Sequence, residues 1–259
     1  MTERDEQLKA FGKLLDIMDE LREKCPWDRK QTLESLRHLT IEETYELGDA
    51  ILDNDMKEIR KELGDLMLHI VFYSKIASET DSFGIKEVLD GINEKLIHRH
   101  PHVFGDVVAE SEDEVARNWE QLKLKEGKKS ILEGVPRSLP ALIKASRIQD
   151  KAASAGFDWE EPGQVFEKVK EELAELREEI DSGKQEKVEA EFGDVLFSLI
   201  NYSRFIKVDP ESALERTNKK FIQRFRYLET EAEKNGESLQ DMTLEQMDVY
   251  WNKSKELFG

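Results

Sequence analysis

Apolar residues recur at spacings of three and four along most of this chain, with Glu and Lys filling the positions between them. This spacing places the apolar side chains on one face, which is typical of an amphipathic helix packed on a core. Four segments show the pattern most clearly and are predicted to be helices: 32–53, 57–79, 164–181 and 185–206. Asp53-Asn54-Asp55 and Ser182-Gly183 interrupt the pattern and predict two antiparallel helix pairs.

Two further helix starts are predicted, at Ser111, which is followed by Glu114, and at Asp209-Pro210. The apolar and polar alternation of a strand is nearly absent from the sequence. The predicted fold class is therefore all-α, in the form of a helical bundle.

The helix pairs belong to an internal repeat. A shift of 129 positions places residues 42–74 on residues 171–203 without a gap, and ten of the 33 pairs are identical. Five of the ten pairs are carboxylates: Glu42/Glu171, Glu43/Glu172, Glu46/Glu175, Glu62/Glu191 and Asp65/Asp194. The Gly-Asp pairs and the apolar runs that follow them make a chance match improbable.

The repeat extends beyond this block with small changes of offset, as expected if insertions fall in loops. Pro26-Trp27-Asp28 resembles Gly156-Phe157-Asp158, and Trp119 and Lys123 align with Trp251 and Lys255. The stretch between the copies, GKKSILEGVPRSLP, carries two Gly and two Pro and is typical of a linker. We therefore predict a first module at 1–126, a linker at 127–140 and a second module at 141–259.

Composition narrows the classes of function. Acidic residues number 57 against 39 basic ones, giving a formal charge of −18, so a basic nucleic-acid footprint is excluded. The uncharged runs 66–74 and 195–203 are half as long as a membrane span, and the charged N-terminus does not resemble a signal peptide. Cys25 is the only cysteine, which rules out an internal disulfide and favours a cytoplasmic location.

The repeated carboxylates are the strongest chemical signal. Residues three and four apart share a helix face, so Glu172 and Glu175 point the same way, as do Glu191 and Asp194 on the next helix. If the helices pack antiparallel, the four groups converge and raise one another's pKa unless a cation lies among them. The alternative is that both helices simply expose an acidic face to water, which would be the preferred interpretation for any one of these Glu residues taken alone. The first copy offers the same set: Glu43, Glu46, Glu62 and Asp65.

The kind of metal follows from the ligands that are missing. All five histidines lie in the first copy, so a site in the second copy can have only oxygen ligands, which suits Mg²⁺ or Mn²⁺. The segment from His98 to His102 offers a weaker zinc alternative, but Pro101 more simply ends a helix there. A phosphate-loop motif and a Glu-x-x-His pair are both absent, which excludes P-loop and ferritin-like di-iron enzymes.

Carboxylate-bound Mg²⁺ most often serves substrate phosphates, and such a site needs further cations. Here the copies differ, because Lys168 aligns with Leu39 and Lys187 aligns with Glu58. Two more cations, Lys220 and Arg224, recur in the first copy as Lys95 and Arg99. The second copy is therefore better equipped to neutralise a polyphosphate.

These residues resemble the MazG family of nucleoside triphosphate pyrophosphohydrolases from end to end. E-E-x-x-E followed by E-x-x-D occurs twice, together with CPWD (25–28), RHPHVFGD (99–106), GFDW (156–159) and EFGDVLF (191–197). The resemblance implies an all-α bundle of two tandem modules that works as a homodimer and cleaves NTPs and dNTPs to the nucleoside monophosphate and pyrophosphate with Mg²⁺. The cellular role that the resemblance implies is cleaning or regulation of the nucleotide pool.

The resemblance also assigns residues, most of them in the second module. It implies metal ligands at Glu172, Glu175, Glu191 and Asp194 and nucleotide contacts at Lys168, Val169, Lys170, Glu171, Lys187, Val188, Glu189, Ala190, Lys220, Arg224 and Trp251. We expect Glu171 or a ligand Glu such as Glu172 to take the proton of the attacking water, and Lys187 with other cations to hold the leaving pyrophosphate.

Two alternatives stay open at this point. One is a non-catalytic helical dimer that senses nucleotide or binds a protein, a role that suits the first module best because it lacks the two lysines. The other is a metal-binding bundle that acts on a different phosphate compound, such as a phosphoribosyl-ATP. Aromatic residues such as Phe157 and Trp159 offer surfaces on which a base can stack, although helical spacing makes a core role the more common one.

Overall fold

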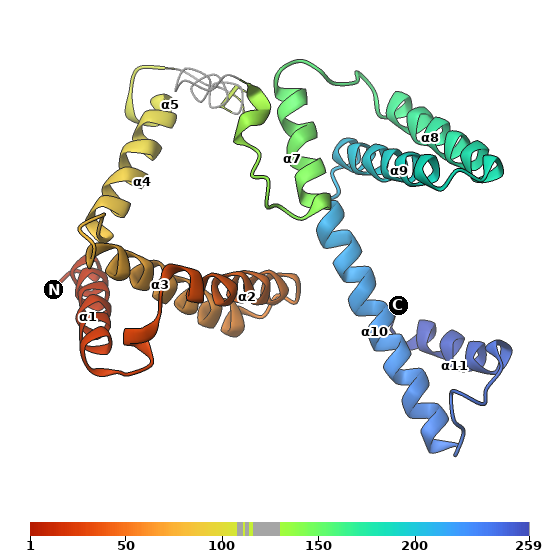
Figure 1. Cartoon of the computed structure of the whole chain (residues 1–259), viewed down its shortest axis with the longest axis horizontal. Coiled ribbons are helices and arrows are strands. Elements are labelled where there is room, and N and C mark those ends of the chain that lie inside the picture. Colours follow the sequence, from red (N-terminus) through yellow and green to blue (C-terminus); the bar gives the residue numbers. More distant parts are fainter. Residues whose placement is uncertain (108–110, 112–113, 116–129, 259) are drawn as a thin grey trace. The chain divides into compact units, whose positions relative to one another are not determined.

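The computed structural model describes residues 1–107, 111, 114–115 and 130–258 and divides the chain into two compact units, Met1–Val115 and Ala116–Gly259 (Figure 1). All regular elements in the described ranges are helical, as predicted. The predicted module boundary at 126/127 and the first residues of the predicted linker lie outside those ranges, as do Trp119 and Lys123.

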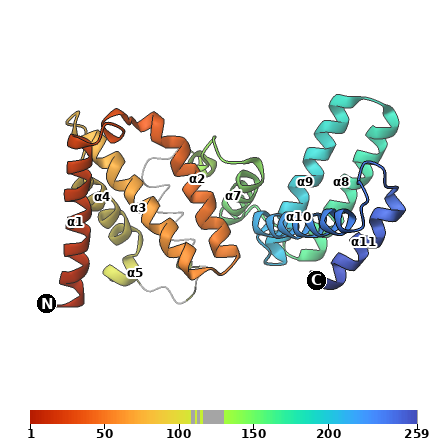
Figure 2. The same ribbon diagram turned by 90° about the horizontal axis from the view of Figure 1, so that it is seen from below.

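Among the described residues up to Phe104, the first unit has four α-helices, a single-turn helix and a 3₁₀ turn. Their bounds are α1 Glu3–Lys24, η1 Asp28–Lys30, α2 Leu33–Leu52, α3 Met56–Ser78, α4 Ile85–Arg99 and α5 Pro101–Phe104. Figure 2 shows α1 beside the antiparallel α2–α3 pair, where it packs on α3. A helix is predicted to end at Pro101 in the histidine-rich segment. In the structure α4 ends at Arg99, and Pro101 begins α5.

The second unit repeats the order of the α-helices of the first, whereas its 3₁₀ turn comes before the first of them. Its elements are η2 Ile131–Gly134, α7 Ala141–Ser154, α8 Pro162–Ser182, α9 Gln185–Phe205, α10 Pro210–Lys234 and α11 Leu244–Leu257. The α8–α9 pair corresponds to α2–α3, and α7 packs on α9 as α1 packs on α3. The tandem repeat read from the sequence is thus present in the fold.

Local sequence explains where the helices begin and end. The Asp55 side chain accepts hydrogen bonds from the first backbone amides of α3, and Asp209 caps α10 in the same way, directly before Pro210. Gly183 ends α8 in the left-handed conformation, at φ 71°, which glycine adopts without strain. The four predicted helices are confirmed, with bounds that differ by at most two residues.

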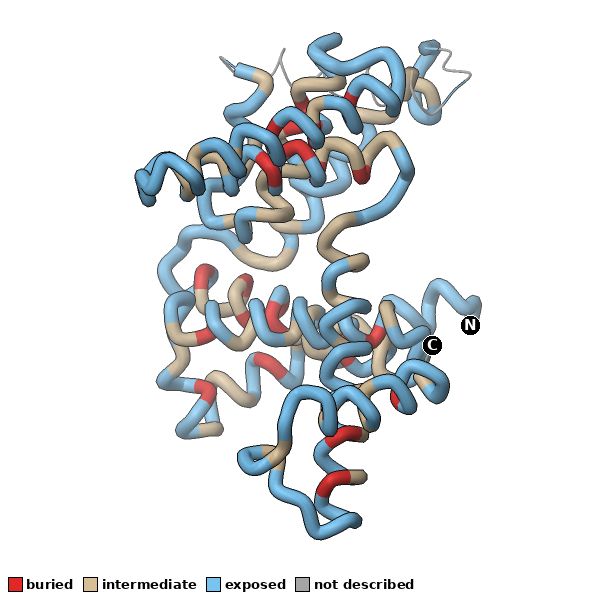
Figure 3. Tube along the Cα trace, turned by 90° about the vertical axis from the view of Figure 1, so that its right-hand side faces the viewer, coloured by how far each residue is buried: buried red, intermediate tan, exposed pale blue. Residues whose placement is uncertain are grey.

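The core of each unit lies between helices of its pair and the helix beside it. In the first unit the buried cluster is Met18, Leu36, Val71 and Phe72, contributed by α1, α2 and α3. In the second unit the buried apolar residues on α8 and α9 are Val165, Val169, Val195 and Ile200. Figure 3 shows buried positions as short stretches on helices that are otherwise exposed or half-buried.

Many large apolar side chains remain exposed, most visibly on α10. Leu214, Phe221, Ile222 and Phe225 all expose more than a third of their surface. This helix leads away from the α8–α9 pair (Figure 1) and packs mainly on α11 and, less extensively, on α7. A search of the described helices found none long and apolar enough to cross a membrane.

Candidate active site in the second module

Three carboxylates meet between α8 and α9. Glu172 and Glu175 come from α8 and Glu191 from α9, and each offers an oxygen atom within 4.8 Å of the other two. Antiparallel packing of the two helices brings them together, as the three-residue and four-residue spacing predicts. Glu172 is buried, with 7 % of its surface exposed. The fourth predicted ligand, Asp194, is exposed and lies outside this group.

Lys168 neutralises one end of the group. Its Nζ atom lies 2.8 Å from Oε1 of Glu171 and 2.7 Å from Oε1 of Glu172. These two carboxylates hold the pKa of Lys168 well above its usual value. The pKa of Glu175 is also raised, here by burial and by the neighbouring negative charge of Glu172. Lys168 alone therefore does not balance the negative charge of the group.

Lys187 lies at the other end of the group, on the first turn of α9. Its Nζ atom is 2.7 Å from Oε1 of Glu179, one helical turn beyond Glu175 on α8. The residues that follow it are half-buried at Val188 and exposed at Glu189 and Ala190. The sequence comparison found Lys187 but missed Glu179, whose equivalent in the first copy is Ala50.

The other residues of the predicted nucleotide segment on α8 face different surroundings. The side chain of Val169 packs in the core, with 2 % of its surface exposed. Lys170 points away from the carboxylates, with its Nζ atom 2.8 Å from Oε1 of Glu167 and 5.0 Å from the centre of the Phe166 ring.

The remaining predicted nucleotide contacts form a separate set on α10 and α11. The Phe221 ring packs on Trp251 at 5.1 Å between centroids, and Lys220 and Arg224 lie on the same stretch of α10. The Nε atom of Arg224 is buried without a hydrogen-bond partner. Because α10 packs on α11 and α7, the structure does not bring this set to the carboxylates of its own chain.

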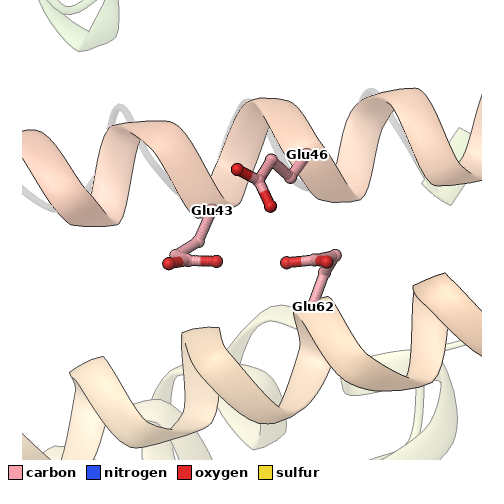
Figure 4. A group of neighbouring side chains, drawn as sticks. All are labelled: Glu43, Glu46 and Glu62. Carbon is pink, nitrogen blue, oxygen red and sulfur yellow. The ribbon is translucent and has the colours of Figure 1, made fainter.

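The first module repeats the carboxylate geometry. Glu43 and Glu46 from α2 and Glu62 from α3 also offer oxygen atoms within 4.8 Å of one another, and Figure 4 shows them around the space between the two helices. Lys61 bonds Oε1 of Glu62 at 2.7 Å and lowers the pKa of that carboxyl group. Burial, then the neighbouring carboxylates, raise the pKa of Glu43. Asp65, like Asp194, stays outside the group of three.

Both groups fit a hard divalent cation. Each donor set consists of carboxylate oxygens alone, the ligands that Mg²⁺ and Mn²⁺ prefer. In the first module only 2 % of the surface of Glu62 is exposed, and its buried Oε2 atom has no hydrogen-bond partner. Leaving a buried carboxylate oxygen unpaired is unfavourable, and a bound cation would relieve it. Within the described ranges these are the only clusters with metal-ligand spacing. Neither contains a histidine, so the zinc site suggested for the segment from His98 to His102 has no cluster to support it there.

An apolar cavity of about 540 Å³ lies beside the C-terminal half of α9. Its walls include the rings of Phe157, Trp159 and Phe197. Gln149 lines it as well, donating a hydrogen bond from Nε2 to the Phe197 carbonyl oxygen while its buried Oε1 has no partner. The two aromatic residues of the GFDW motif therefore line a cavity rather than fill the core.

Comparison with known proteins agrees with this geometry. The family model described as "MazG nucleotide pyrophosphohydrolase domain" matches twice, at residues 31–104 and 161–228. This chain belongs to the MazG family. Each match contains one helix pair with its three carboxylates, so both clusters are part of a MazG domain.

Two similar proteins match the MazG chain over nearly its full length, and a third matches about half of it. A nucleoside triphosphate pyrophosphohydrolase/pyrophosphatase MazG of Thermotoga maritima is 47 % identical over 250 residues, which is 95 % of each chain. The nucleoside triphosphate pyrophosphohydrolase of Escherichia coli K12 is 41 % identical over 257 residues, 96 % of this chain and 98 % of that one. A Mycobacterium tuberculosis enzyme of the same name matches 54 % of this chain at 38 % identity, over 44 % of its own length.

Proposed function

We propose that the second module of this MazG protein hydrolyses nucleoside triphosphates, both NTPs and dNTPs, to the nucleoside monophosphate and pyrophosphate with the help of Mg²⁺. That the chain is a nucleoside triphosphate pyrophosphohydrolase rests on its family and on relatives of that name with near-complete coverage. The site assignment rests on one observation, the group of Glu172, Glu175 and Glu191 with a lysine at each end.

The cation would be held by Glu172, Glu175 and Glu191, with Asp194 as the fourth predicted ligand. When bound, Mg²⁺ supplies the charge that polarises the phosphate oxygens and offsets the repulsion between the carboxylates and the substrate. Mn²⁺ has the same preference for oxygen ligands and is the expected substitute. A role in nucleotide-pool cleaning or regulation follows from this activity, and a cytoplasmic location stays a prediction from the single cysteine.

Hydrolysis at the α-phosphorus needs a base and a charged leaving-group site. Glu171 is exposed beside the buried Glu172 and accepts the proton as water adds to the phosphorus. The bond from that phosphorus to the bridging oxygen breaks, and pyrophosphate leaves with the bonding electron pair. Lys168 and Lys187, at the two ends of the carboxylate group, hold the charge that develops on it. Positioning and charge neutralisation suffice for such chemistry, without a covalent nucleophile.

A homodimer would complete the site. Lys220, Arg224 and Trp251 lie on helices that pack away from the carboxylates of their own chain, whereas the resemblance assigns them to the nucleotide. The exposed apolar side chains of α10 are of the kind that mark protein interfaces. We therefore propose that a second copy covers this face and places its α10 beside the α8–α9 pair.

The first module is the candidate for the alternative role, sensing nucleotide or holding the dimer together. It keeps the three carboxylates, but Leu39 and Glu58 stand where the second module has Lys168 and Lys187. Its lysine at the cluster, Lys61, bonds Glu62 from the neighbouring position on α3. This module can hold a cation, yet it lacks the two positive charges that a triphosphate needs.

Metal removal tests the proposed chemistry. Protein stripped with EDTA is expected to lose turnover of every NTP and to regain it with Mg²⁺ or Mn²⁺, because three adjacent carboxylates repel a triphosphate when no cation is present. Calorimetry with the metal alone should show binding at millimolar or lower concentration. Full turnover in EDTA would exclude this mechanism.

A further inference from the structure

The charged stripe on α8 continues past the residues that the family pattern identifies. Residues 168, 172, 175 and 179 follow one another at spacings of four, three and four, so they share one helix face. Glu179 is the last carboxylate of this face before the turn to α9. It lies opposite the start of α9, where Lys187 stands one turn before Glu191.

Glu179 is fixed from both sides. Oε2 accepts a hydrogen bond from Oγ of Ser182 at 2.8 Å, while Oε1 meets Nζ of Lys187 at 2.7 Å. The Glu179 side chain is 22 % exposed, less than that of Lys187 at 55 %. The lysine lowers the pKa of Glu179, and Glu179 in turn raises the pKa of Lys187. Both groups therefore stay charged across the neutral range.

The first module lacks both partners of this pair. Ala50 stands at the position of Glu179 and Glu58 at the position of Lys187. Glu58 instead lies 3.7 Å from Lys61 on its own helix. An ion pair kept only to support a helical hairpin would serve both modules equally. Here it occurs in the module that carries the lysines for a polyphosphate.

We infer that Glu179 is a positioning residue, which holds the Lys187 ammonium group at the end of the carboxylate cluster where the leaving pyrophosphate collects. A lysine side chain has a flexible four-carbon stem and loses conformational entropy when its ammonium group is fixed in one place. A carboxylate that already holds the ammonium group in the folded protein lowers the entropy lost in the reaction itself. The inference rests on the proposed function, because it assumes that Lys187 meets the substrate.

A mutant cycle in the full-length protein tests this role. Glu179→Ala is expected to lower kcat about tenfold with KM changed less than about twofold, since the misplaced charge matters most when pyrophosphate departs. Glu179→Asp should recover most of kcat, because a flexible lysine can still reach a shorter carboxylate. In a Lys187→Ala background, Glu179→Ala should have no further effect, as expected for two residues that act as one unit.

The control is a matched ion pair on α10. Lys234 and Glu231 lie 2.8 Å apart with side-chain exposures of 65 % and 26 %, and Glu231→Ala is expected to leave kcat unchanged. Additive effects of Glu179→Ala and Lys187→Ala, unchanged kcat in Glu179→Ala, or an aspartate no better than alanine would each overturn the positioning role. Whatever the Glu179 variants show, loss of turnover in Glu172→Gln would leave the proposed site in the second module intact, whereas a fully active Glu172→Gln would refute that site.

Discussion

Glu172→Gln is expected to lower kcat at least about 1,000-fold, the equivalent of roughly 4 kcal/mol of lost transition-state stabilisation. Glu172 is the most buried carboxylate of its group and contacts Lys168, so it joins the proposed cation site to the lysine proposed to bind phosphate. Glutamine keeps the size and one oxygen but removes the charge that holds a divalent cation. Release of pyrophosphate, followed at saturating Mg²⁺ and nucleotide, measures the effect.

The matched control is Glu43→Gln, the same change at the equivalent position of the first module. It is expected to retain at least half of the turnover, because that module lacks the counterparts of Lys168 and Lys187. Circular dichroism of both variants should match that of the unmodified protein. Similar losses in the two variants would mean that both modules carry out hydrolysis. Full activity of Glu172→Gln would refute the assignment of the site.

Ile222→Asp is expected to convert the proposed dimer to monomers and to lower kcat/KM about 100-fold. Ile222 is 48 % exposed on the apolar face of α10, so a carboxylate there stays solvated in the monomer but is buried without a partner in an interface. Light scattering gives the oligomeric state. Gln223→Asp, on the side of α10 turned away from Phe221 and Phe225, adds the same charge and should leave the proposed dimer intact.

A mixing experiment separates two reasons for such a loss. If α10 of one copy serves the carboxylates of the other, then Glu172→Gln and Arg224→Ala chains are each inactive, but their mixed dimer holds one complete site. Random assembly should then restore about a quarter of the normal activity, since half of the dimers are mixed and half of their sites are complete. No recovery on mixing would show that each chain serves its own site.

The helices of this protein are predictable from its sequence because their causes are local. Apolar spacing, the caps at Asp55 and Asp209, and the left-handed Gly183 set the ends of helices without reference to the tertiary structure. The offset of 129 residues also predicts which helix pairs are equivalent. The direction of α10 is not predictable in this way, because α10 packs on α11 and α7 rather than on the α8–α9 pair.

The candidate site is predictable in part. Three of the four carboxylates in each module converge because helix periodicity fixes their face, whereas the exposed Asp194 lies outside its group of three. The partner of Lys187 depends on side-chain reach across the helix pair, which spacing alone does not give. Lys187 therefore meets Glu179, a residue that no motif marks.

The most direct test of the central claim is a count of products. Purified full-length protein is incubated with each common NTP and dNTP and Mg²⁺, and nucleoside monophosphate, nucleoside diphosphate, pyrophosphate and orthophosphate are quantified separately. Cleavage between the α- and β-phosphates predicts monophosphate and pyrophosphate in equal amounts at the earliest times. Nucleoside diphosphate with orthophosphate as the first products would contradict the proposed reaction.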